Sequence, residues 1–283
     1  HAHTYYTHLF RNSKKVELNG RYTHHAIFDE TIKFIKKNKN NPFFLYCPWT
    51  PPHAAYQIPE DEPAWEMYQD KPWPHDARVA AAMDTMMDRH VGEITALLKK
   101  FGIYQNTLMF FTSDNGAAKR FDGIHNSSGV MQGKKRSLNE GGIRVPMVVR
   151  WPGEIKAGRV SSHPWYFPDV MPTFAEICGV STEVPEDIDG ISILPTLLDK
   201  GVQKQHEYMF WQYGVRAVRS GKWKGIGKGG HLYLYDLSED MEEKIDLSSK
   251  HPEIAARMKK YITIGYREPR SQKDDGKYTG KDK

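Results

Sequence analysis

The fold of this chain is decided by the stretch Phe110-Phe111-Thr112-Ser113-Asp114-Asn115-Gly116. Together with the apolar residues just before it, it predicts a buried strand over 107–111 that runs straight into an Asp-Asn pair. Polar side chains at this point suit a ligand site at the carboxyl end of a parallel strand in an α/β sheet. The Asp114 carboxylate and the Asn115 amide are hard oxygen donors of the kind that Ca²⁺ or Mg²⁺ takes. Taken alone, the pattern favours an Asx-turn, and the metal site depends on the motifs around it.

Two further motifs accompany this one. Residues 133–153 read GKKRSLNEGGIRVPMVVRWPG, and residues 41–54 read NPFFLYCPWTPPHA. In this order and at these spacings, the three motifs resemble the C-terminal half of type I sulfatases, the arylsulfatase branch of the alkaline phosphatase superfamily. The resemblance covers nearly the whole chain. It implies an α/β fold with a mixed sheet flanked by helices, its N-terminal part missing, and a small C-terminal antiparallel sheet.

Length and composition set broader limits. The 283 residues can bury one large domain or a domain with a small appendage, and no apolar run approaches the length of a membrane span. The net charge of +5 would suit an anionic substrate without selecting one, and no basic-aromatic pattern suggests nucleic acid. The two cysteines, Cys47 and Cys178, follow apolar segments and are predicted to be buried free thiols. Because the chain opens on His1, we expect a piece of something longer.

Periodicity predicts the elements and domains. We expect helices over 23–38, 76–101, 167–178 and 252–264, strands over 43–46 and 145–150, and a long surface loop over 55–76. Four short strand candidates in the last third predict a small antiparallel sheet: 208–211, 215–218, 223–226 and 232–235. We therefore divide the chain into a catalytic-domain part (1–200), an antiparallel α+β subdomain (201–266) and a flexible polar tail (267–283).

The resemblance also implies a cation and an anion-binding lysine. Asp114 and Asn115 match ligands of a metal that is generally Ca²⁺ in the family, with Mg²⁺ as the alternative. Lys135 stands five residues before Glu140, where the family's K-x-x-x-x-E-G-G pattern has its sulfate-binding lysine. Lys134 is the neighbouring rival. The Glu140-Gly141-Gly142 segment and Arg144 are expected to support this loop.

Two histidines are expected to act on the substrate. His53 matches the family's Pro-His, which implies contact with the sulfate or the leaving-group oxygen and a role as general acid, a task that suits an imidazole. His125 lies between the two later motifs and is a candidate to touch the sugar. Either histidine, taken without the match, would more often be structural.

The chain departs from the family pattern at its nucleophile. Type I sulfatases use a formylglycine made from a C/S-x-P/A-x-R motif, and this sequence has none; Cys47-Pro48-Trp49-Thr50-Pro51 does not fit it. The family's N-terminal Asp-Asp pair, which completes the metal site, is also missing. Both are expected in a missing N-terminal part, so the fragment alone is predicted to be inactive.

We therefore expect a hydrolase of sulfate monoesters, acting on sulfated carbohydrates or other small sulfated molecules. The alternatives are a phosphoryl or phosphonate hydrolase of the same superfamily and a non-catalytic scaffold that binds anions or metal. No nucleic acid or membrane partner is expected. The resemblance implies a periplasmic, secreted or lysosome-like location, and the oligomeric state is left open.

Overall fold

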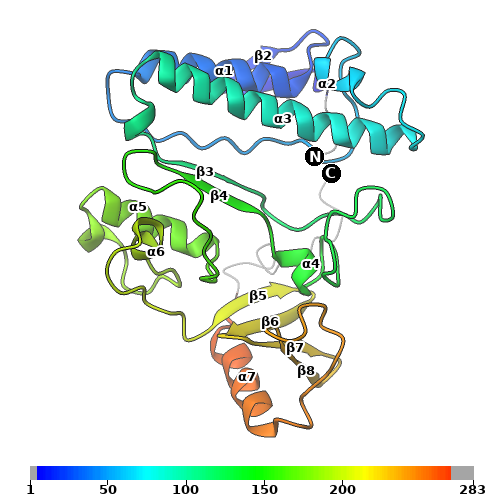
Figure 1. The fold of residues 1–283 in the computed structure, drawn as a ribbon, viewed down its shortest axis with the longest axis vertical. Coiled ribbons are helices and arrows are strands. Elements are labelled where there is room, and N and C mark those ends of the chain that lie inside the picture. The colour runs from blue at the N-terminus through cyan, green and yellow to red at the C-terminus, as the bar shows by residue number, and fades with distance from the viewer. Residues whose placement is uncertain (1–4, 269–283) are drawn as a thin grey trace. The chain divides into compact units, whose positions relative to one another are not determined.

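Apolar residues at helical spacing form the two long helices of the N-terminal part, α1 (Thr23–Asn38) and α3 (His75–Lys100), as Figure 1 shows. The computed structural model describes residues 5–268. By its internal contacts the chain separates into unit 1, up to Thr107 with Gly123–His125, and unit 2, which takes 108–122 and the residues from 126 onward. The methionine stripe of α3 is core, as predicted, since Met83 and Met86 are fully buried.

The rest of unit 1 is short elements and loop. Strands β1 (His8–Arg11) and β2 (Lys14–Glu17) pair as an antiparallel hairpin. Helix α2 (Pro63–Glu66) interrupts the predicted loop, and the 3₁₀ turn η1 (Tyr104–Asn106) follows α3. The predicted strand over 43–46 is wrong in the described chain: this segment belongs to no strand, and Phe44 is 70% and Tyr46 72% exposed. A strand is defined by a ladder of hydrogen bonds to a neighbouring strand, and residues 43–46 are part of no such ladder within the described residues.

Unit 2 begins with a two-stranded ribbon. Strands β3 (Met109–Thr112) and β4 (Met147–Arg150) pair antiparallel, with Phe111 opposite Val148. The expectation of a buried, parallel strand at this point is therefore wrong within the described residues, because the partner of β3 is antiparallel and both of these paired side chains are exposed. The predicted position of the Asp-Asn pair is confirmed, because Ser113 and this pair directly follow the end of β3.

The middle of unit 2 is built from short helical segments. They are α4 (Glu140–Ile143), η2 (Phe167–Asp169), α5 (Val170–Ile177), η3 (Ser181–Glu183) and α6 (Leu194–Leu198). Helix α5 buries Thr173 but leaves Met171 exposed, and Cys178 after its last residue is exposed as well. The prediction that Cys178 is buried is thus wrong, because this apolar helix is covered on one face only; Cys47 is half-buried.

The C-terminal antiparallel sheet is confirmed. It comprises β5 (Met209–Tyr213), β6 (Val215–Ser220), β7 (Trp223–Lys228) and β8 (His231–Asp236), in that order. Helix α7 (Pro252–Ile264) lies across one face (Figure 1). Side chains alternate between the two faces. Val218, Leu234 and Met258 form the core beneath α7, whereas Ala217, Ile226 and Tyr235 pack on the other face against Leu138 and Ile143, which flank the charged start of α4.

None of the helices formed by residues 5–268 is both long and apolar enough to cross a membrane. The division of the chain at residues 200 and 266 stays a prediction. Most of the predicted polar tail, residues 269–283, lies outside the described residues.

Candidate active site

The Asp114–Asn115 pair lies in the turn that follows β3. Asp114 is exposed and Asn115 half-buried. The Ser113 hydroxyl donates to the Asn115 carbonyl oxygen over 3.0 Å, and Asn115 Nδ2 donates to Asp114 Oδ1 over 2.5 Å. These bonds keep the two side chains together, but they turn the amide nitrogen toward the carboxylate. Rotation of the amide would present its oxygen beside the carboxylate to a cation, at the cost of this hydrogen bond.

A glycine contact fixes this turn against α4. The Gly116 N–H donates to the Gly142 carbonyl oxygen over 2.9 Å. A Cβ at position 116 would lie 2.1 Å from the Gly141 carbonyl oxygen, far closer than van der Waals contact allows. Only glycine therefore permits the backbone after Asn115 to reach α4.

Lys135 lies on the loop that enters α4, and this loop is bonded to the same turn. The Lys135 N–H donates to the Ala117 carbonyl oxygen over 2.8 Å. The side chain of Lys135 is half-buried, and within residues 5–268 its ammonium makes no hydrogen bond or ion pair. The rival Lys134 is exposed, and its N–H is bonded to Ser137 Oγ over 3.0 Å. The structure thus brings the Lys135 loop to the Asp114–Asn115 turn.

A buried charge cluster holds the first residue of α4. Lys224 Nζ lies 2.8 Å from Glu140 Oε1 and 2.9 Å from Glu243 Oε1. The Glu140 N–H donates to Glu243 Oε2 over 2.6 Å, and Arg144 Nη1 lies 3.6 Å from Glu140 Oε2. Burial raises the pKa of Glu243 against the opposing charge of Lys224. Arg144 contacts Glu140, and its expected support of the loop stays a prediction. Sequence reasoning missed Lys224 and Glu243.

His53 belongs to unit 1, on the loop that follows residues 43–46, and is exposed. Its backbone N–H donates to the Thr50 carbonyl oxygen over 3.0 Å. Its ring Nδ1 lies 2.6 Å from the Ala54 carbonyl oxygen. Because a carbonyl only accepts, Nδ1 carries the proton, and Nε2 is left to exchange a proton with a substrate.

His125 also groups with unit 1 and is half-buried. Its ring meets that of Trp73 edge to face, with the centroids 5.6 Å apart. The predicted site residues are therefore divided: Asp114, Asn115 and Lys135 are gathered around α4 in unit 2, and the two histidines are in unit 1. The role of each stays a prediction.

The donor set at Asp114 fits part of a calcium site. It offers only oxygens, the ligands of hard cations, but Ca²⁺ takes roughly six to eight of them. Among residues 5–268, no three His, Cys, Asp or Glu side chains lie close enough to hold a metal ion. Asp114 and Asn115 could thus hold Ca²⁺ only as part of a larger set of oxygen ligands.

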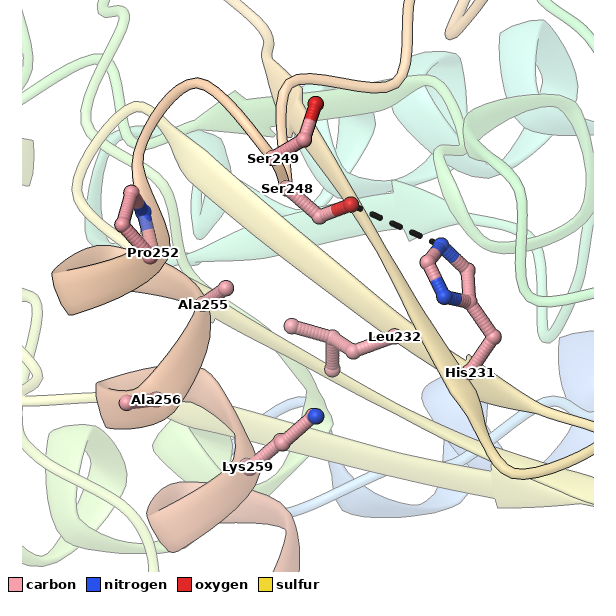
Figure 2. A pocket seen from close by; sticks show the side chains of 8 residues that line it. All are labelled: His231, Leu232, Ser248, Ser249, Pro252, Ala255, Ala256 and Lys259. Atoms are coloured by element: carbon pink, nitrogen blue, oxygen red, sulfur yellow. Dashed lines mark hydrogen bonds between the residues drawn. The ribbon is translucent and has the colours of Figure 1, made fainter.

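A second polar cluster lines a cavity of about 340 Å³ between β8 and α7, shown in Figure 2. His231 Nε2 lies 2.8 Å from Asp246 Oδ2 and 3.5 Å from Ser248 Oγ. Burial acts to raise the pKa of Asp246, but hydrogen bonds from His231 and from two backbone N–H groups lower it to about 2. A Ser-His-Asp relay needs its serine and aspartate on opposite ring nitrogens. Here they share one, so this cluster is no nucleophile relay.

The chain is similar to sulfatases throughout. The family model described as Sulfatase matches residues 2–180, and the model for the C-terminal region of N-sulphoglucosamine sulphohydrolase matches residues 132–264. Steryl-sulfatase of Mus musculus is 34% identical over 213 residues, which are 70% of this chain and 32% of that protein. N-acetylgalactosamine-6-sulfatase of Canis lupus familiaris is 32% identical over 225 residues, 77% of this chain and 40% of that protein.

Solved structures agree. Ps i-CgsB in complex with k-i-k-neocarrahexaose superposes with a TM-score of 0.78 at 30% identity and covers 90% of this chain. The match takes in 56% of the Ps i-CgsB chain. This chain thus spans less than half the length of the two curated relatives and little more than half of that structure.

Proposed function

We propose a function for this chain from the premise that it belongs to the sulfatase family. The chain is part of an enzyme that hydrolyses sulfate monoesters of carbohydrates and works outside the cytoplasm. The substrate class is supported by the similar proteins, since one is named an N-acetylgalactosamine-6-sulfatase and another was solved with a neocarrahexaose.

One observation carries the proposal: α4 joins the Asp114–Asn115 turn and the Lys135 loop. Gly116 is bonded to α4, and the Lys135 N–H is bonded to Ala117 in the same turn. Two backbone segments that brace one another therefore carry an oxygen donor pair and the Lys135 ammonium, which has no partner among residues 5–268. A cation and a lysine placed together suit an anionic substrate with charge spread over several oxygens.

The residues would divide the work as follows. Asp114 and Asn115 would hold Ca²⁺, and the bound cation would supply Lewis-acid polarisation of the substrate. Lys135 pairs its ammonium with a sulfate oxygen as charge develops in the transition state. His53, protonated at Nε2, gives a proton to the oxygen of the departing alcohol.

None of these residues is assigned the role of nucleophile. No C/S-x-P/A-x-R motif occurs in the 283 residues. In the family a formylglycine supplies the oxygen nucleophile at sulfur. We therefore expect the chain by itself to turn over neither 4-nitrophenyl sulfate nor 4-nitrophenyl phosphate. Measurable hydrolysis of the sulfate ester would contradict the proposed inactivity, and hydrolysis of the phosphate ester alone would favour the phosphoryl alternative.

The cation site is tested by calorimetric titration of this chain with CaCl₂. The test variant is Asp114→Ala, and the matched control is Asp122→Ala. The control removes an exposed carboxylate that lies 4.0 Å from Lys119 on the next loop. We expect weak binding by the wild type and by D122A, and binding at least about tenfold weaker in D114A, because a carboxylate is the strongest ligand of the pair. Equal affinity in D114A would place the cation elsewhere.

A further inference from the structure

Lys224 is the most unusual residue of the C-terminal sheet. It lies in β7 between Trp223 and Gly225, and its side chain is 0% exposed. Taking an ammonium out of water costs several kcal/mol even after relaxation, so such a group is retained only where its partners fix it well. Its two partners, Glu140 and Glu243, are buried as completely. A well-packed apolar side chain could fill the same space without this cost.

Hydrogen bonds within its own turn fix the position of Glu243. The Lys244 and Ile245 N–H groups both donate to Asp240 Oδ2 over 2.8 Å, which closes the turn on which Glu243 lies. Glu243 then makes two contacts, an ion pair with Lys224 and a hydrogen bond from the Glu140 N–H. Its carboxylate therefore binds the first backbone N–H of α4, while Lys224 binds the Glu140 side chain.

From α4 the contacts continue to the candidate site. The Gly116 N–H reaches Gly142 at 2.9 Å, and the Gly141 N–H reaches Gln132 at 2.7 Å on the loop that bears Lys135. Helix α4 has only one turn and cannot hold its own position by helical hydrogen bonds. Its place is set by what fixes its ends, and the directional contacts at its start come from Lys224 and Glu243.

We infer that Lys224 and Glu243 are positioning residues for the candidate active site, which act through Glu140 and α4 on the Asp114–Gly116 turn and on Lys135. This rests on the proposed function for what the site does, but the mechanical link can be tested without it. In this view the C-terminal sheet carries part of the apparatus that aligns the cation ligands with the sulfate-binding lysine.

The test is amide hydrogen exchange on the ¹⁵N-labelled chain without ligand, comparing Lys224→Met with Lys222→Met. Lys222 is the matched control, since it precedes β7, its own side chain is exposed, and its ion pair of 2.6 Å is with Asp236 rather than with Glu140 or Glu243. In K224M we expect the amides of Gly116, Lys135 and Gly141 to exchange at least about tenfold faster and their resonances to shift. Amides of β5 and β6 should change less than about twofold. K222M should change neither set.

A second variant guards against loss of folding. Glu140→Gln keeps the shape of the side chain and leaves Lys224 paired with Glu243, so we expect the same three amides to exchange at least about threefold faster. Because both substitutions remove the same contact between Lys224 and Glu140, exchange in E140Q/K224M should exceed that in K224M little or not at all. Unchanged exchange at the turn and the loop, equal acceleration in the sheet, or additive effects would overturn the inference. Failure of the wild type to bind CaCl₂ would count against the proposed function and leave this result standing.

Discussion

The imidazole of His53 has one nitrogen bonded to the backbone and one left for chemistry. In a protein that joins this chain to a nucleophile, His53→Ala should lower kcat about 100-fold or more for a sugar sulfate, whose alcohol must be protonated as it leaves. For 4-nitrophenyl sulfate, whose leaving group is stable as an anion, the loss should be below about tenfold. The measurement is kcat against leaving-group pKa, and an equal loss for both esters would rule out a general acid at this position.

The two adjacent lysines differ in burial, and this difference makes a matched pair of variants. Lys135 is half-buried on the loop bonded to Ala117, whereas Lys134 is exposed. We expect Lys135→Met to lower kcat/KM for a sulfate ester by about 100-fold, as the loss of a positioned donor to developing charge does. Lys134→Met should cost less than about threefold. The reverse order would assign the sulfate contact to Lys134.

Sequence reasoning reaches these residues through motifs, and it misses the ones that hold them. Asp114, Lys135 and Glu140 belong to short sequence motifs, and these motifs predict their chemical roles. Lys224 does not, because its partner Glu140 lies 84 residues away. A lysine between Trp223 and Gly225 in a predicted strand is unusual. The neighbouring residues, however, do not predict which carboxylate it pairs with.

At the scale of elements, helices are predicted well and strands only where their partners are near in sequence. Helices 23–38 and 252–264 were predicted to the residue, since i→i+4 bonds and apolar spacing are local. The last four strands are joined by short turns and were predicted as a sheet. Residues 43–46 alternate between half-buried and exposed as a strand would, yet they belong to no sheet among the described residues. Pairing over long separations cannot be read from composition.

The contact of the Asp114–Gly116 turn with α4 predicts a strong effect of one methyl group. Gly116→Ala would place a Cβ 2.1 Å from the Gly141 carbonyl oxygen, so the backbone must move, at a cost on the order of 2 kcal/mol in the free energy of unfolding. Gly92→Ala is the control, since nothing lies within 4 Å of its Cβ position in α3 and alanine favours a helix by about 1 kcal/mol. Urea unfolding should thus show opposite signs, and a neutral G116A would contradict the close packing.

On the scale of the whole molecule, unit 1 contains a pair of histidines that resists protonation. His24 Nε2 of α1 lies 2.9 Å from His90 Nδ1 of α3, and the His90 ring stacks on Phe28. Burial, with the nearby charges of His25 and Arg89, lowers the pKa of His24 to about 4. Burial and the same surroundings lower that of His90 to about 3. At neutral pH a hydrogen bond between two neutral rings therefore links α1 and α3.

This pair predicts how the stability of unit 1 depends on pH. In the unfolded chain both rings take up protons near pH 6.5, whereas in the fold they stay neutral until about pH 4, so acid favours unfolding. The free energy of unfolding should be level above about pH 7 and fall by roughly 6 kcal/mol between pH 7 and 4, about half of it from each ring. His90→Gln should flatten this slope, while His75→Gln, an exposed position at the start of α3, should not. Urea unfolding followed through the amide resonances of α1 and α3 measures both. If the slope in H90Q matches the wild type, other groups cause the acid sensitivity.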